Sequence, residues 1–287
     1  MTAVENTDTQ PPRHLIVTVY GLYARSGEGA GEGEGWLSVA ALIRLLADLD
    51  VDEPAVRSAI SRLKRRGILQ ARRHAAAAGY ELSASALAIL REGDARIFRR
   101  ERATLADGWL LAVFSVPESE RHRRHVLRTE LTRLGFGMAA PGVWIVPAYP
   151  GDATAEMLRR LGLDGYADLF HASHVAFGDL REKVREWWDL DQLASLYRDF
   201  IGAQTPVLDR WRGDRQEPAA SPEAGRAFAD YTRALTAWRR LPYLDPGLPA
   251  ELLPEDWIGS RAAGLFFALR GLLAEPAGDY VRQVVAG

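Results

Sequence analysis

The most constraining feature of the sequence is a two-sided helix pattern over residues 53–65. Apolar residues recur there at three- and four-residue spacing, so at about 100° per residue they share one face of a helix. These residues are Val56, Ala59, Ile60 and Leu63. The opposite face carries hydroxyl and cationic side chains, namely Arg57, Ser58, Ser61, Arg62, Lys64 and Arg65. Such a helix buries one face in a core and leaves the other to solvent or to a partner.

A short hairpin pattern follows this helix directly. Arg66-Gly67 ends the helix, since glycine is common just beyond a helix C-terminus. Residues 68–73 and 79–83 then have the composition of two strands around a small-residue turn. A basic helix followed at once by a hairpin is typical of a winged helix-turn-helix, in which the hairpin is the wing.

Positive charge is concentrated on this segment. From Asp52 to His74 seven Lys or Arg stand against two acids, a formal charge of +5, whereas the whole chain carries −2. A local cationic patch indicates a polyanionic partner, because phosphate neutralisation supplies most non-specific nucleic-acid affinity. The alternative is a solvated face that binds no partner, since most charged surface residues contact only water. We predict that the partner is double-stranded DNA.

We expect two roles among these side chains. Those on the outer arc of the helix reach base edges in the major groove. They are Arg57, Ser58, Ser61, Arg62 and Arg65. The remaining cations contact phosphates, which fix the protein on the duplex. They are Lys64, Arg66, Arg72 and Arg73.

Length and composition limit the other possibilities. A chain of 287 residues, 47% hydrophobic and 26% charged, is long enough for two or three domains. Cysteine is absent, which excludes disulfides, thiol nucleophiles and cysteine-ligated zinc. No run approaches the roughly eighteen apolar residues of a membrane span, and the start lacks the features of a signal peptide. We therefore expect a cytoplasmic protein.

The N-terminal third predicts helices on both sides of the hairpin. They are expected at 15–23, 39–49, 53–65 and 85–102. Ser38 and Asp52 are the predicted caps of the second and third helices. Residues 1–12 are expected to form a disordered tail and the Gly/Glu-rich residues 27–35 a flexible connector. The predicted DNA-binding domain, with its exit helix, spans 13–102.

The rest of the chain predicts two further domains. Strand patterns occur at 109–116, 143–146 and 172–177, and helix patterns at 120–134 and 153–161. With a further, weaker strand between the two helices, this order is the split βαβ of a ferredoxin-like α/β domain over 103–179. Beyond it, aromatic-rich helix patterns at 181–200, 224–241 and 255–273 predict an all-α domain over 180–287. The fold class is therefore α+β and multidomain.

Several segments resemble the PaaX-like family of bacterial transcription regulators, the repressors of phenylacetate degradation. Residues 56–67 resemble its recognition helix, 79–82 the exit of its wing, and Arg96-Ile97 the end of its first domain. The segments that resemble its middle domain, whose fold is similar to the small CRISPR-associated Cas2 proteins, are 109–118, 121–137 and 141–147. The resemblance covers roughly residues 13 to 180, and beyond them only the helical, Trp-rich character is similar.

The resemblance implies a homodimeric repressor of a catabolic operon that binds a pseudo-palindromic operator. It also implies release by a small-molecule inducer, which in the founding members is an aryl-acetyl coenzyme A thioester. Two-fold pairing of subunits agrees with the DNA-binding helix predicted from the residues, since one recognition helix covers only a few base pairs. We accordingly predict a regulator with no catalytic residues, no metal and no cofactor.

The middle domain offers a candidate inducer site. A coenzyme A ester needs a concave surface with aromatic lining and cations for its phosphates. Trp109, Arg124, Arg128 and Trp144 are our candidates. The alternative is that this arginine-rich helix contacts phosphate or forms the rim of a dimer interface, and that the tryptophans are core.

Two other functions stay open. A metal-dependent nucleic-acid enzyme on the Cas2-like fold needs acidic residues at the end of the first strand of this domain, whereas Asp107 precedes that strand. His122 with His125, and His171 with His174, have three-residue spacing, but two imidazoles without a third ligand are weak evidence for a metal. The second possibility is a winged helix that binds a protein instead of DNA.

Overall fold

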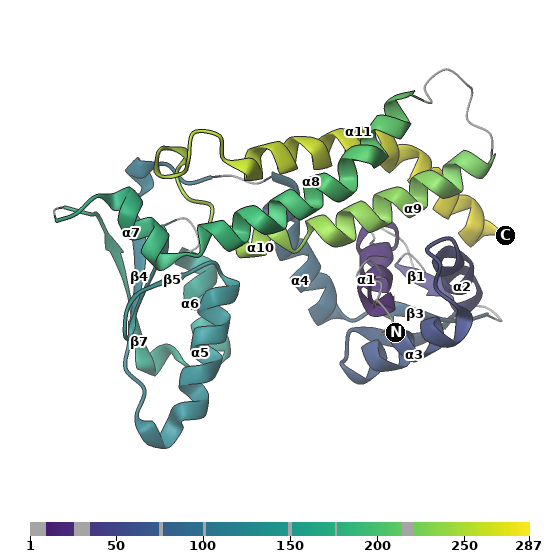
Figure 1. Cartoon of the computed structure of the whole chain (residues 1–287). Coiled ribbons are helices and arrows are strands. Elements are labelled where there is room, and N and C mark those ends of the chain that lie inside the picture. The colour runs from purple at the N-terminus through teal and green to yellow at the C-terminus, as the bar shows by residue number, and fades with distance from the viewer. Residues whose placement is uncertain are drawn as a thin grey trace, which may run out of the picture. The chain divides into compact units, whose positions relative to one another are not determined.

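Figure 1 shows the computed structural model, which describes residues 10–25, 35–74, 77–99, 102–148, 151–175, 177–213 and 221–287. Most of the predicted tail at 1–12 and of the connector at 27–35 lies outside these residues. The chain mixes helix and sheet and divides into two compact units. The first takes in 1–95, 201–238 and 263–287, and the second takes in 96–200 and 239–262.

Three helices of the first unit follow the predicted pattern. They are α1 (Pro12–Tyr23), α2 (Val39–Ala47) and α3 (Glu53–Arg65). Both predicted caps are confirmed, since the Ala41 amide donates to Ser38 Oγ at 3.0 Å and the Ala55 amide donates to Asp52 Oδ1 at 2.7 Å. Helix α2 ends two residues earlier than predicted, because the chain turns through Asp50 at a φ of 60°.

A three-stranded antiparallel sheet in the order β1-β3-β2 completes this part. Its strands are β1 (Trp36–Ser38), β2 (Leu69–His74) and β3 (Ala77–Leu82). The hairpin of β2 and β3 is the predicted one, whereas β1 was not predicted, because three residues are too few for an alternation pattern. Tyr20 of α1 donates from its hydroxyl to Tyr80 O at 2.8 Å, which fixes the sheet to the helices.

The predicted helix over 85–102 begins as α4 (Ala84–Asp94) and continues as a π-helical turn (Ala95–Arg99). Arg25 of the first unit pairs with both carboxylate oxygens of Asp94, at 2.6 and 2.9 Å. Two residues later, Arg96 donates to Pro242 O and Leu134 O within the second unit. The chain therefore passes from one unit to the other within this π-helical turn.

The C-terminal helices are shared between the units. The long ones are α8 (Leu190–Gly213), α9 (Ser221–Trp238) and α11 (Ile258–Ala286). The sequence predicts a helical domain of its own over 180–287, whereas the contacts assign α9 and the later parts of α8 and α11 to the first unit. There Thr236 donates to the hydroxyl of Thr18 at 2.8 Å, and the Tyr280 hydroxyl donates to Asp48 Oδ2 at 2.6 Å. Burial, and then this hydrogen bond, raise the pKa of Tyr280 to about 12, so the phenol stays a donor at neutral pH.

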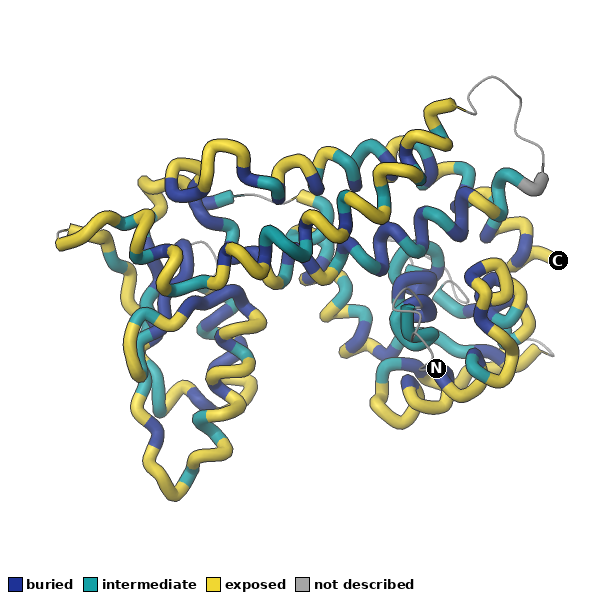
Figure 2. Tube along the Cα trace, viewed as in Figure 1, coloured by how far each residue is buried: buried dark blue, intermediate teal, exposed yellow. Residues whose placement is uncertain are grey.

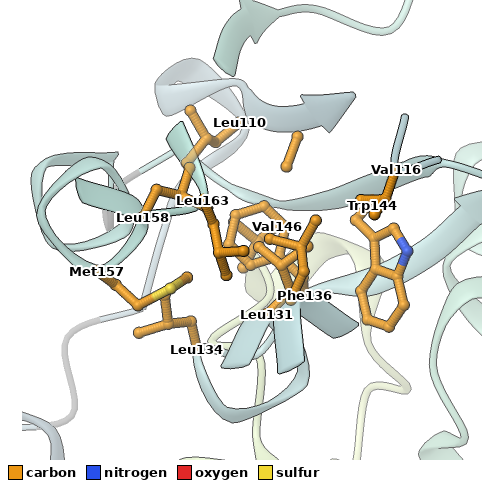
Figure 3. Close-up of a cluster of buried hydrophobic side chains, with 12 residues drawn as sticks. Leu110, Val116, Leu131, Leu134, Phe136, Trp144, Val146, Met157, Leu158 and Leu163 are labelled. Atoms are coloured by element: carbon orange, nitrogen blue, oxygen red, sulfur yellow. The ribbon is translucent and has the colours of Figure 1, made fainter. Parts of the chain in front are cut away.

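The second unit contains a four-stranded antiparallel sheet with two helices on one face. In chain order its elements are β4 (Trp109–Phe114), α5 (Arg121–Arg133), β5 (Gly137–Ala140), β6 (Val143–Pro147), α6 (Gly151–Arg160) and β7 (Ala167–Ala172). The sheet order β5-β6-β4-β7 is that of the predicted split βαβ. Leu110, Leu131 and Met157, from β4, α5 and α6, meet in the core between the layers (Figure 3).

The predicted position of the last strand was wrong. The sequence predicts a strand at 172–177, whereas β7 ends at Ala172 and pairs with β4 from Trp109↔Ala172 to Phe114↔Ala167. Strand β7 lies at the edge of the sheet, and its residues are exposed or only partly buried (Figure 2). A half-exposed edge strand contains more polar residues than a buried one, so the more apolar segment after it was the misleading signal.

Shorter elements complete the second unit. They are the 3₁₀ turns Leu105–Asp107, Glu118–Glu120, Asp164–Tyr166 and Ala250–Leu252, and the helices α7 (Leu180–Trp187) and α10 (Leu241–Leu244). Buried Asp245 accepts hydrogen bonds from Arg102 at 3.1 Å and from the Tyr197 hydroxyl at 2.8 Å, so its charge is paired. Among the described residues, none of the helices combines the length and the apolarity that a membrane crossing requires.

The close approach of β1 to β3 predicts a destabilising substitution. A Cβ atom at Gly79 would lie 2.3 Å from Trp36 Cε2 and 2.4 Å from Leu37 O, so Gly79→Ala forces the strands apart. We expect a loss of about 1–3 kcal/mol in the free energy of unfolding, measured by urea denaturation. Gly202→Ala is the matched control: nothing lies within 4 Å of its Cβ, and the added helix propensity stabilises by about 0.5–1 kcal/mol. Equal effects of the two substitutions would contradict the packing of β1 on β3.

Candidate nucleic-acid interface

Helix α3 is fixed at both ends by local sequence. Asp52 caps its first turn, where Pro54 needs no amide partner. The helix ends at Arg66, and Gly67 follows with a φ of 68°, a left-handed conformation that glycine adopts without strain. These signals set where α3 begins and ends.

The two faces of α3 are separated as the sequence predicts. Val56, Ala59, Ile60 and Leu63 are all buried. The nine predicted DNA-contact residues are all exposed. They are Arg57, Ser58, Ser61, Arg62, Lys64, Arg65 and Arg66 on or just after α3, and Arg72 and Arg73 on β2. The fold therefore brings these nine side chains to the surface on two consecutive elements.

Two of these cations have partners inside the protein. Arg57 pairs with Glu53 at 2.7 Å, one helical turn earlier, and Arg72 pairs with Glu81 across the hairpin at 3.3 Å. The other five cations form no ion pair with any described residue. They are Arg62, Lys64, Arg65, Arg66 and Arg73. An exposed cation without an internal partner keeps its full charge for an external anion.

The ion pairs of Glu53 and Glu81 and the aromatic support of the hairpin were not predicted from the sequence. Glu53 precedes Arg57 by four residues, a spacing that favours a helix surface pair and was visible in the sequence. Trp36 of β1 donates from its indole nitrogen to Arg72 O at 2.9 Å. Its ring also lies 5.7 Å from that of His74. No sequence signal indicated this support, because it depends on the pairing of β1 with β3.

A second group of predicted residues lines a cleft in the sheet unit. Arg124, Arg128 and Trp144 border a cavity of about 480 Å³ together with Phe114 and Met138. The Arg128 guanidinium lies 6.0 Å from the Trp144 ring centroid. The cleft is therefore apolar with a cationic edge.

The two arginines of this cleft differ in their partners. Arg124 donates to Val116 O at 2.7 Å and pairs with Glu118 at 3.0 Å. Arg128 makes no ion pair with the described residues, and its other contact is with the Met138 sulfur at 3.9 Å. Arg128 is thus the more available cation for a ligand.

Trp109, the fourth predicted inducer residue, lies elsewhere. It packs edge-on against Trp187 at 5.8 Å and stacks with Trp188 at 6.2 Å between ring centroids. Trp188 in turn donates from its indole nitrogen to Gly135 O at 2.9 Å. The structure therefore brings three of the four predicted residues together and uses Trp109 to attach α7 to the sheet.

Carboxylate and imidazole groups of the described residues do not form a metal site. Among the described residues, no three His, Cys, Asp or Glu side chains are grouped as a metal site requires. Asp107 precedes β4, where its carboxylate accepts from the amide and the hydroxyl of Thr104 at 2.7 and 2.9 Å. These hydrogen bonds hold the pKa of Asp107 below its usual value. The carboxylate therefore has a structural role at the entry to the strand.

Three family models match consecutive parts of the chain. The model described as "PaaX-like protein" matches residues 11–86, and "PaaX protein central Cas2-like domain" matches 102–184. The model described as "PaaX-like protein C-terminal domain" matches 188–283. The chain belongs to the PaaX-like family. Helix α3 and the hairpin lie in the first PaaX-like match, and the cleft of Arg128 lies in the central one.

One curated relative supports this placement, and one solved structure is similar in fold. The chain is 29% identical over 257 residues to the transcriptional repressor PaaX of Escherichia coli strain K12, covering 88% of this chain and 78% of the relative. It is also similar to the structure of the uncharacterized protein Rv0674 from Mycobacterium tuberculosis. That structure gives a TM-score of 0.52 and 25% identity over 93% of this chain and 97% of the other.

The cap of α3 gives a prediction that needs no ligand. Asp52→Ala removes the acceptor of the Ala55 amide, and we expect a loss of about 0.5–2 kcal/mol in the free energy of unfolding. Asp52→Asn keeps a capping oxygen and should cost much less. Urea denaturation of both variants measures the difference. A loss as large for Asn as for Ala would show that the cap is not the source of the effect.

Proposed function

We propose that this chain is a sequence-specific DNA-binding transcriptional repressor of a catabolic operon, of the phenylacetate type. Its relative in Escherichia coli is a transcriptional repressor, which supports this and agrees with a regulator that is not an enzyme. The observation that supports this proposal most directly is a group of five exposed cations on α3 and β2. They form no ion pair with the described residues. Such a surface in a chain of net charge −2 suits a polyanion.

We propose that α1 to α3 with the β2–β3 hairpin form a winged helix-turn-helix. In this arrangement α3 is the recognition helix, and Arg57, Ser58, Ser61, Arg62 and Arg65 enter the major groove. Lys64, Arg66, Arg72 and Arg73 contact phosphates. Arg57 and Arg72 exchange their internal carboxylates for DNA, which is feasible because exposed ion pairs contribute only about 0–1 kcal/mol.

The proposed repressor is a homodimer in the cytoplasm. Pairing of two recognition helices doubles the number of base pairs read and matches a two-fold symmetric operator. Exposed apolar side chains beside the edge strand β7 support a subunit contact, since Val175 is 89% and Phe177 is 91% exposed. Phe170 on β7 itself is also exposed. A second copy that covers these side chains would remove them from water.

We propose that a small-molecule inducer, such as an aryl-acetyl coenzyme A thioester, binds in the cleft of Arg124, Arg128 and Trp144. The cavity of about 480 Å³ lies in the size range of ligand sites. Trp144 and Phe114 offer apolar surface to an aryl group, and Arg128 offers a charge to a phosphate or a thioester oxygen.

Substitutions in the two classes of cation test the DNA function. Arg62→Ala should cost about 1–3 kcal/mol on a fragment of the protein's own promoter region and little on random DNA, because it removes a base contact. Arg73→Ala should weaken binding to both DNAs alike and reduce the salt slope by about one, because it removes a phosphate contact. Fluorescence anisotropy at several salt concentrations measures both. Equal losses on both DNAs for both variants would reject base reading by Arg62.

The inducer cleft has its own test. Arg128→Ala should raise about tenfold the concentration of phenylacetyl coenzyme A that releases half of the bound promoter DNA, because a charge-assisted contact is lost. Arg133→Ala is the matched control, since Arg133 lies on the same helix but pairs with Glu130 at 2.9 Å. If both variants respond to the thioester as the unsubstituted protein does, the inducer does not use this cleft.

A further inference from the structure

A second cavity lies in the first unit, directly at the turn between α2 and α3. It has a volume of about 330 Å³ and is bordered by Asp50 of that turn and by residues of α1, α8 and α9. Leu15 and Leu49 supply buried apolar surface to its lining, and Val207 supplies more. The cavity is therefore adjacent to the recognition helix, since Asp50 precedes the cap of α3 by two residues.

Side chains of two C-terminal helices bind the carboxylates of this turn. Arg233 of α9 pairs with Asp50 at 2.6 Å, and Tyr280 of α11 donates to Asp48 at 2.6 Å. The Asp50 side chain is 90% exposed and that of Arg233 is 37% exposed, so water competes for this pair. Arg233 thus has a partner that another carboxylate is able to displace.

One residue of the lining, Gln10, has an acceptor without a donor. Gln10, which borders the cavity, donates from its side-chain nitrogen to Arg233 O at 3.0 Å. Its amide oxygen is buried and receives no hydrogen bond from the described residues. A buried acceptor left in this state is costly, and a ligand hydroxyl would satisfy it.

We propose that this cavity binds a small aromatic carboxylic acid that carries a hydroxyl group. The ligand carboxylate takes the place of Asp50 on Arg233, the hydroxyl donates to the Gln10 amide oxygen, and the ring packs on Leu15 and Leu49. Asp230, the other acid of the lining, is already paired with Arg210 at 2.8 Å and adds little repulsion. This site is separate from the inducer cleft of Arg128 and responds to a smaller ligand.

Occupancy of the site releases the turn that positions α3. Once Arg233 binds the ligand, its ion pair with Asp50 is broken, so fewer contacts hold the turn that precedes α3. Affinity for specific DNA then falls. This consequence rests on the proposed function, whereas ligand binding does not and is measured separately.

Calorimetric titration of the full chain tests the ligand class with three probes. 4-Hydroxybenzoate has the carboxylate and the donor, benzoate lacks the hydroxyl, and phenol lacks the carboxylate. We expect 4-hydroxybenzoate to bind at least fivefold more tightly than benzoate, and phenol not to bind measurably. The Gln10→Leu variant should bind 4-hydroxybenzoate only as tightly as it binds benzoate. Absence of binding by 4-hydroxybenzoate, or equal affinity for it and benzoate, overturns the proposal whatever the protein does with DNA.

Anisotropy with the promoter fragment tests the coupling. Saturating 4-hydroxybenzoate should raise the dissociation constant for DNA at least threefold in the unsubstituted protein. The Arg233→Gln variant should have a dissociation constant for DNA that is raised by a similar factor in the absence of ligand. Adding 4-hydroxybenzoate should not raise it further. Arg226→Gln, an exposed arginine on the same helix that does not border the cavity, should respond like the unsubstituted protein. Ligand binding with unchanged DNA affinity overturns the coupling, and failure to bind DNA at all counts against the proposed function alone.

Discussion

The burial of one face of α3 is the constraint on which the rest of the first unit depends. Val56, Ile60 and Leu63 are nearly inaccessible to water, and each buried aliphatic side chain contributes about 1.5–3 kcal/mol. Rotating the helix by half a turn would expose these residues and bury arginines, which costs several kcal/mol for each unpaired charge. The cationic face is therefore directed outward by the apolar face, independently of any partner.

The arrangement of α1, α2 and α3 does not depend on local sequence alone. Its first helix contacts α9 through Thr18 and Thr236, and its central turn is tied to α9 and α11 through Asp50 and Asp48. Residues more than 180 positions away thus complete the surroundings of α3. Helices α8 and α11 each contribute residues to the second unit as well as to the first.

What could be predicted from the sequence was local. Helix periodicity, the caps Ser38 and Asp52 and the hairpin are encoded within a few residues, so they were predictable. Strand β1, the position of β7 and the division of the C-terminal helices depend on pairing between distant segments, and a single sequence carries no direct signal for such contacts. In the candidate site, the exposure of the nine polar and basic residues was predictable, whereas the support of the hairpin by Trp36 was not.

Internal pairs of arginine and glutamate affect how a chain with a net negative charge binds a polyanion. Glu53 and Glu81 neutralise Arg57 and Arg72 while the protein is free, and these exposed pairs contribute little to its stability. Against DNA the two acids become repulsive unless their arginines turn to phosphate or base. A correct sequence that offers a guanine edge to Arg57 compensates the broken pair with a bidentate contact, whereas random DNA offers only phosphate. In the proposed complex, Glu53 therefore weakens non-specific binding more than specific binding, and the net charge of −2 is compatible with recognition of an operator.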